Sequence, residues 1–126
     1  MRKTLVAAAI ATAFLTGQAF AASGKLVLYT SQPNKDAQQT VDAFKKAHPD
    51  VDVEWVRDGT TKVMAKLRAE FAAGAPKPDV LLIADVVNME QLKSEGRLMA
   101  YDAAPIAGYE AGIHDADKTY FSTKLI

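Results

Sequence analysis

The sequence contains no cysteine, so disulfide bonds, thiolate zinc sites and cysteine nucleophiles are excluded. Neither sign of charge is in excess, because 15 Lys and Arg residues balance 15 Asp and Glu residues, and this gives no basic surface for nucleic acid. No apolar run reaches the roughly 20 residues of a membrane-spanning helix. The Walker loop, Gly-x-Gly-x-x-Gly and Gly-x-Ser-x-Gly are also absent, so nucleotide-binding and hydrolase functions lack their minimal residues.

The N-terminus has the pattern of an export signal. Arg2 and Lys3 precede an apolar run at residues 5–15, and the Ala-Phe-Ala sequence at 19–21 has the small residues that signal peptidase reads. We therefore predict that residues 1–21 are a signal peptide and that the protein is periplasmic; the alternative is a retained interfacial anchor. Cleavage leaves 105 residues, with 13 Lys and Arg against 15 Asp and Glu.

Short apolar runs alternate with segments of helical spacing along the rest of the chain. The predicted strands are Lys25–Thr30, Val51–Arg57 and Asp79–Ala84, and the predicted helices are Lys35–His48, Lys62–Ala73 and Val87–Glu95. Asn34 is the predicted N-cap of the first helix. Residues 101–118 are predicted to form a loop, followed by a fourth strand that begins at Tyr120.

This alternating order predicts an α/β fold with a parallel sheet and right-handed crossovers. Val51–Arg57 alternates between apolar and polar residues, as an edge strand does, which favours the spatial order 2-1-3. Asp79–Ala84 is apolar from Val80 onward and is therefore predicted to be central. We expect residues 22–126 to form one lobe, truncated inside its last strand.

Ligands of parallel α/β sheets bind beyond the carboxyl ends of the strands. The residues predicted to bind a ligand there are Ser31, Gln32, Gly59, Thr60, Thr61 and Asp85. They follow the three strands at points where helices begin, and free helix N–H groups attract anions. The other interpretation is that these residues are ordinary helix caps. Asp58 and Asp85 also suit an amine or a cation, while His48 and His114 lack partners at metal-ligand spacing. No cofactor or resident metal is predicted.

Three segments together resemble a known family: Leu26–Ser31, Asp79–Asp85 and Met89–Leu98. They are similar to the first lobe of the extracellular solute-binding proteins of ABC importers, in particular the ferric-iron and phosphonate-type branch. The resemblance covers Lys25 to Ile126, and the order of the segments is more specific than any one of them.

The resemblance implies a non-enzymatic receptor with two lobes that close on a solute and deliver it to a membrane permease. The strand near Tyr120 would cross to the second lobe, and the first lobe would contribute Ser31, Gln32, Gly59, Thr60 and Asp85 to the cleft. The solute would be iron, a phosphonate or a related anion. Ferric-iron members often have a histidine after the first strand, where this chain has Gln32-Pro33-Asn34; an organic or phosphonate anion therefore suits this lobe better.

Two other functions stay open at this point. The chain could be a small exported accessory domain or enzyme with a flavodoxin-like fold. It could also be a structural fragment that self-associates through an unpaired strand. A second lobe encoded downstream would distinguish both from the receptor.

Overall fold

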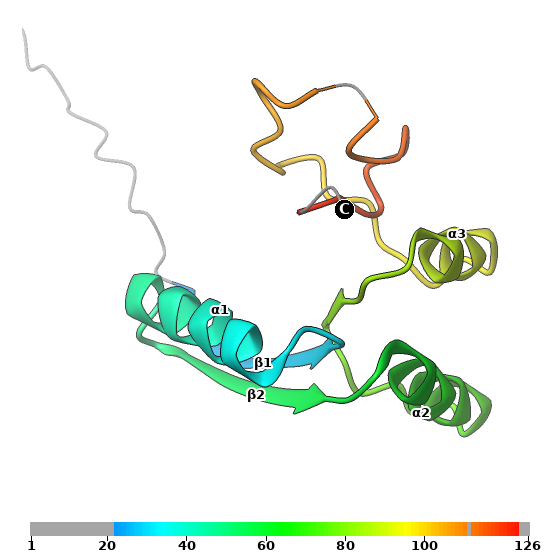
Figure 1. The fold of residues 1–126 in the computed structure, drawn as a ribbon, viewed down its shortest axis with the longest axis horizontal. Coiled ribbons are helices and arrows are strands. Elements are labelled where there is room, and N and C mark those ends of the chain that lie inside the picture. Colours follow the sequence, from blue (N-terminus) through cyan, green and yellow to red (C-terminus); the bar gives the residue numbers. More distant parts are fainter. Residues whose placement is uncertain (1–21, 111, 124–126) are drawn as a thin grey trace, which may run out of the picture.

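The structure is a computed structural model that describes residues 22–110 and 112–123. The elements are β1 (Gly24–Thr30), α1 (Asn34–Ala47), β2 (Val51–Arg57), α2 (Thr60–Ala72), β3 (Val80–Leu82) and α3 (Val86–Ser94). In Figure 1, α1 runs along the β1–β2 pair, and α2 and α3 lie next to each other on the other side of the picture. The chain after α3 forms a separate group of loops.

The three strands form a parallel sheet in the order β2-β1-β3, which confirms the predicted α/β fold and strand order. β1 pairs with β2 along its whole length, from Gly24 opposite Val51 to Thr30 opposite Arg57. It is the central strand because its side chains are apolar on both faces, which suits burial between two layers. Its last three residues, from Leu28, are buried.

β3 differs from its prediction. The apolar run at residues 79–84 predicts a central strand, but only Val80–Leu82 pair, and they pair with β1 alone. Val80 is 44% exposed. The pairing ends early because the N–H of Ala84 turns to the side chain of Ser31. An apolar run therefore marks the strand correctly and overstates its length and its burial.

All three helices begin one or two residues earlier than predicted, and α3 starts at Val86. Asn34 is the first residue of α1 and not its N-cap; Pro33 holds the cap position, and no side chain caps the helix. The fixed φ of proline suits a helix start, and its O accepts from the N–H of Ala37 at 2.9 Å. α2 begins at Thr60, with Gly59 as its cap residue, so Thr61 also belongs to the first turn.

The face of the sheet that carries Tyr29 packs against α2. Tyr29 is 1% exposed, and its hydroxyl donates to Glu70 Oε1 at 2.6 Å. Beside it, Leu67 of α2 and Leu92 of α3 form the centre of an apolar cluster with Leu81 of β3. Burial of these side chains, at about 25 cal/mol per Å², fixes α2 and α3 against the sheet.

The segment after α3 contains no sheet strand within the described residues. Phe121 forms one isolated antiparallel bridge with His114, so the fourth strand predicted from Tyr120 is not formed over residues 120–123. Residues 124–126, which complete that prediction, lie outside the described residues, as does the predicted signal peptide. Among the described helices, none has the length and apolar character to cross a membrane.

Candidate functional site

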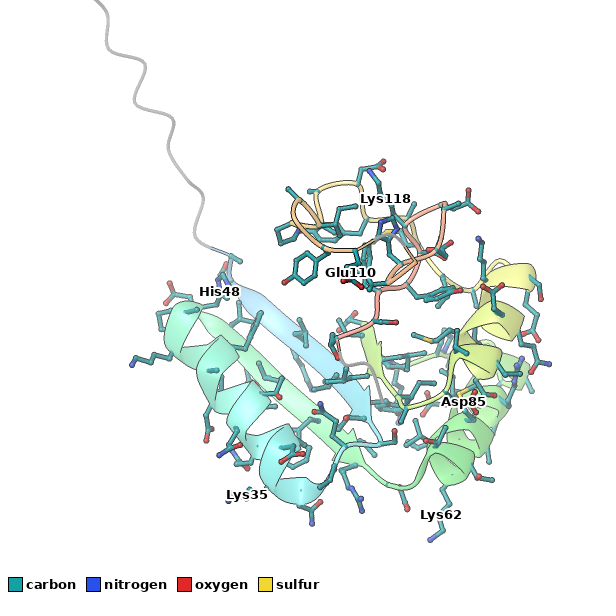
Figure 2. All side chains as sticks on the ribbon, turned by 45° about the horizontal axis from the view of Figure 1, so that its top comes forward. Lys35, His48, Lys62, Asp85, Glu110 and Lys118 are labelled. Atoms are coloured by element: carbon teal, nitrogen blue, oxygen red, sulfur yellow. The ribbon has the colours of Figure 1, made fainter. Side chains whose placement is uncertain are left out.

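The carboxyl ends of the three strands meet at one edge of the sheet, which we call the rim: residues 31–34 after β1, 58–61 after β2 and 84–85 after β3. Figure 2 shows Lys35 and Lys62 projecting from the same end of the molecule, whereas His48 lies at the opposite end of α1. The parallel pairing thus brings all six predicted site residues to the same edge, although they come from segments up to 54 residues apart in sequence.

Hydrogen bonds join the strand ends. Thr30 is completely buried, and its hydroxyl donates to the O of Leu82 at 2.9 Å and accepts from the N–H of Gln32 at 3.1 Å. Arg57 Nε donates to the O of Gln32 at 2.7 Å, which ties the end of β2 to the end of β1. The rim is therefore a connected structure and not three independent loops.

Ser31 and Gln32 have different partners at the rim. The Ser31 hydroxyl, which was predicted to contact a ligand, accepts a hydrogen bond from the N–H of Ala84 at 3.1 Å. It therefore links the ends of β1 and β3. Gln32 Oε1 is buried and has no hydrogen-bond partner in the described structure. A buried acceptor without a donor is destabilising by about 1–3 kcal/mol, so this oxygen is suited to a donor group on a solute.

Asp85 is the N-cap of α3. Its Oδ1 accepts the N–H groups of Val87 and Asn88 at 2.9 and 3.3 Å, and its Oδ2 accepts the side-chain amide of Asn88 at 2.6 Å. Both carboxylate oxygens are occupied, which favours the capping interpretation over direct contact with a cation or amine. The N-terminus of α3 is closed by this cap.

The N-termini of α1 and α2 have no such cap. Neither helix has a side-chain cap hydrogen bond. For the backbone N–H groups and hydroxyls of Thr60 and Thr61, no hydrogen-bond partner lies within residues 22–110 and 112–123. Unpaired N–H groups in a helix's first turn carry partial positive charge and bind anions. Thr60 and Thr61 are thus the predicted site residues whose donors are free.

Gly59 and Asp58 shape the start of α2. The N–H of Gly59 donates to Asp58 Oδ1 at 2.8 Å, and Lys62 Nζ lies 3.7 Å from the same oxygen. The charge of Asp58 is thereby partly compensated. A Cβ added to Gly59 would meet no atom within 4 Å, and its φ of −60° suits any residue. Gly59 therefore leaves open space above the helix start.

Two residues that directly precede the rim were not predicted from the sequence as part of the site. Thr30 links β3 to Gln32, and Arg57 brings a positive charge to the rim. Thr30 and Arg57 are the last residues of β1 and β2. Their position at a strand end is the feature of the sequence that could have identified them as part of the site. In the parts of the chain that the structure describes, no three His, Asp or Glu side chains come together as a metal site.

The comparison with models of protein families shows to which family the chain belongs. The model described as "Bacterial extracellular solute-binding protein" matches residues 29–125, which is most of the chain. The chain belongs to this family. A search of curated proteins finds no match. Of the three segments that suggested the resemblance, Asp79–Asp85 and Met89–Leu98 lie wholly inside the matched range and Leu26–Ser31 lies inside it from residue 29 onward; the 2-1-3 sheet agrees with the match.

This solute-binding protein also has an apolar cavity of about 660 Å³ away from the rim. It extends around the open side of β3, from Leu26 and Phe44 on one face to Leu98 beyond α3. Thr119, Tyr120, Phe121 and Thr123 form one of its walls. The cavity contains none of the six predicted site residues, so it is separate from the rim.

Proposed function

We propose that this protein is a non-enzymatic receptor that captures a small anionic solute at the rim and delivers it to the permease of an ABC importer. Membership of a solute-binding family supports the receptor role and an exported location in the periplasm. The permease, the signal peptide and a second lobe that closes over the rim are parts of the same proposal, which rests on the resemblance in sequence.

The observation that supports an anionic solute is the difference between the N-termini of the three helices. Asp85 closes α3 with its own carboxylate, while α1 and α2 leave their first N–H groups free. An anion at the rim would replace the missing caps and gain about 0.3–1 kcal/mol from each helix dipole. Arg57 and the hydroxyls of Thr60 and Thr61 add positive charge and donors.

Within the predicted set of iron, phosphonate or a related anion, the rim favours the anion. The carboxylates of Asp58 and Asp85, which would attract a bare cation, are engaged with Gly59, Lys62 and the first turn of α3. Gln32 Oε1 would accept a hydrogen bond from a protonated oxygen or an amine on the solute. A phosphonate that also carries a donor group fits both features.

A thermal-shift and calorimetric screen tests the proposal. The chain, extended through its downstream reading frame so that a second lobe encoded there is included, is titrated with alkyl- and aminoalkylphosphonates, inorganic phosphate, ferric iron, polyamines and neutral sugars. We expect stabilisation by the phosphonates, because a ligand at 100 times its Kd raises the free energy of unfolding by about 2.7 kcal/mol. Stabilisation by ferric iron or polyamines alone would overturn the anionic solute, and no response to any class would favour the accessory-domain alternative.

A further inference from the structure

The segment 113–122, which we call the strap, closes on itself outside the sheet. Ser122 N donates to the O of Ile113 at 2.6 Å, and Asp115 N donates to the O of Tyr120 at 3.3 Å. The bridge between His114 and Phe121 lies between these bonds. The strap is therefore a short hairpin-like unit with its own backbone hydrogen bonds.

One buried carboxylate organises the turn of the strap. Asp115 is only 8% exposed. Its Oδ1 accepts the N–H groups of Thr119 and Tyr120 at 2.6 and 3.1 Å, and its Oδ2 accepts the Thr119 hydroxyl at 3.0 Å and the N–H of Asp117 at 3.3 Å. A buried carboxylate with this many donors stays ionised, and it requires a counter-charge.

That counter-charge comes from α3. Lys93 Nζ lies 2.6 Å from Asp115 Oδ2 and 2.8 Å from Asp117 Oδ2. One turn earlier, Glu90 accepts the hydroxyl of Tyr120. Because residues 90 and 93 lie on the same side of a helix, both attachments hold the strap to the same part of α3.

The strap also forms part of the wall of the apolar cavity. Tyr120 and Phe121 of the strap line the cavity together with Met89 of α3. The polar contacts of the strap are with α3 and with the loop before the strap, whereas the sheet is held by the β1 pairing and by the apolar cluster of α2 and α3. Among the described residues, no hydrogen bond or ion pair joins the strap to the sheet.

We propose that Lys93 and Asp115 form a latch that holds the strap over the cavity, and that the strap opens as a unit, without unfolding of the sheet, when this pair is broken. The proposal is independent of the solute and of the proposed function. It makes the cavity wall a movable part of the fold, held to α3 by the Lys93–Asp115 ion pair together with the hydrogen bond from Tyr120 to Glu90.

Hydrogen–deuterium exchange of the whole chain tests the latch in D115N and in K93M, with D117N as the matched control. Asp117 also pairs with Lys93, but its side chain is 69% exposed and makes no other side-chain hydrogen bond in the described structure. We expect D115N and K93M to raise exchange of the strap amides at least about tenfold. A hydrogen bond to a charged group contributes about 1.5–3 kcal/mol, and about 1.4 kcal/mol corresponds to a factor of ten in the opening equilibrium. In D117N the strap amides should change less than about threefold.

A second readout distinguishes local opening from loss of the fold. Amides of β1 and β2 should keep their wild-type protection in both latch variants, and an apolar dye such as anilinonaphthalene sulfonate should fluoresce more with them than with D117N. Unchanged strap protection in both variants would overturn the proposal. Equal loss of protection in the strap and the sheet would also overturn it, because the strap would then unfold only with the whole lobe.

Discussion

Ser31 accepts a hydrogen bond from the N–H of Ala84 at 3.1 Å, which joins the ends of two strands 53 residues apart in sequence. The bond has two consequences. It ends the pairing of β3 with β1 after Leu82, and it fixes the approach to Asp85 at the rim. A residue predicted from sequence to contact a ligand therefore positions the rim.

Thr30→Val should destabilise the lobe by about 1–3 kcal/mol. The substitution keeps the buried volume but removes a hydroxyl that serves both Leu82 O and Gln32 N. It leaves the N–H of Gln32 without its partner and leaves Leu82 O with the N–H of Ser31 as its donor. Urea denaturation monitored by circular dichroism measures the change. Thr40→Val is the control, because the Thr40 hydroxyl bonds only within α1, is exposed, and should change stability by less than about 0.5 kcal/mol. Equal effects of the two variants would contradict the role of Thr30.

Leu92→Ala should cost about 2–5 kcal/mol, because Leu92 is completely buried between α2 and α3 and the residual cavity is not filled. Met99→Ala is the comparison at an exposed apolar position. The free energies of unfolding of both variants, from urea denaturation, decide the point. A loss below about 1 kcal/mol for Leu92→Ala would show that the α2–α3 cluster is not the core of this lobe.

Asp85 offers a test of cap against ligand. Asp85→Asn keeps a good N-cap and removes the charge, so stability and affinity for a phosphonate should both stay close to wild type. Asp85→Ala removes the cap and should destabilise the protein by about 0.5–2 kcal/mol. A large fall in the affinity of Asp85→Asn for the phosphonate, measured by calorimetry, would show that Asp85 contacts the solute directly.

The strap should respond to acid. Burial by itself raises the pKa of Asp115, but the hydrogen bonds from Lys93, Tyr120 and Thr119 outweigh burial and hold this pKa well below its ordinary value of 3.8. Among the described residues, the charged or titratable groups nearest to this carboxylate are Lys93 from α3, with Asp117 and Tyr120 from the strap itself; Glu90 of α3 accepts the hydroxyl of Tyr120.

Because the folded carboxyl binds its proton less readily than the unfolded one, its stabilisation is complete above about pH 4 and is lost as the pH falls below that value. We expect the excess protection of strap amides in wild type over D115N to shrink progressively below about pH 4. An excess that stays constant down to about pH 2 would contradict a role for the Asp115 charge.

Much of the fold could be predicted from the sequence. The 2-1-3 order followed from the alternation in Val51–Arg57, and that strand has the predicted bounds. The length of β3 could not be predicted, because it depends on a side chain, Ser31, that competes for a backbone N–H far away in sequence. The position of the rim followed from the topology of parallel sheets.

The roles of individual rim residues were beyond sequence reasoning. Asp85 and Thr60 are both polar residues at helix starts, yet Asp85 uses its oxygens on its own helix and Thr60 leaves its donors free. The difference depends on where each helix begins: Asp85 precedes α3, while Thr60 lies inside α2. A shift of one or two residues in a helix boundary decides this, and patterns of residues do not fix boundaries that closely.

The most direct measurement is the affinity of T60P for the phosphonate that stabilises the wild-type chain best, determined by calorimetry beside V86P. Each substitution puts proline at the first position of a helix, where it is tolerated, and removes one N–H. T60P removes an N–H that is free for an anion, whereas V86P acts on the helix that Asp85 caps. The account predicts about tenfold weaker binding for T60P and unchanged binding for V86P. Unchanged binding by T60P would contradict capture of an anion at the start of α2.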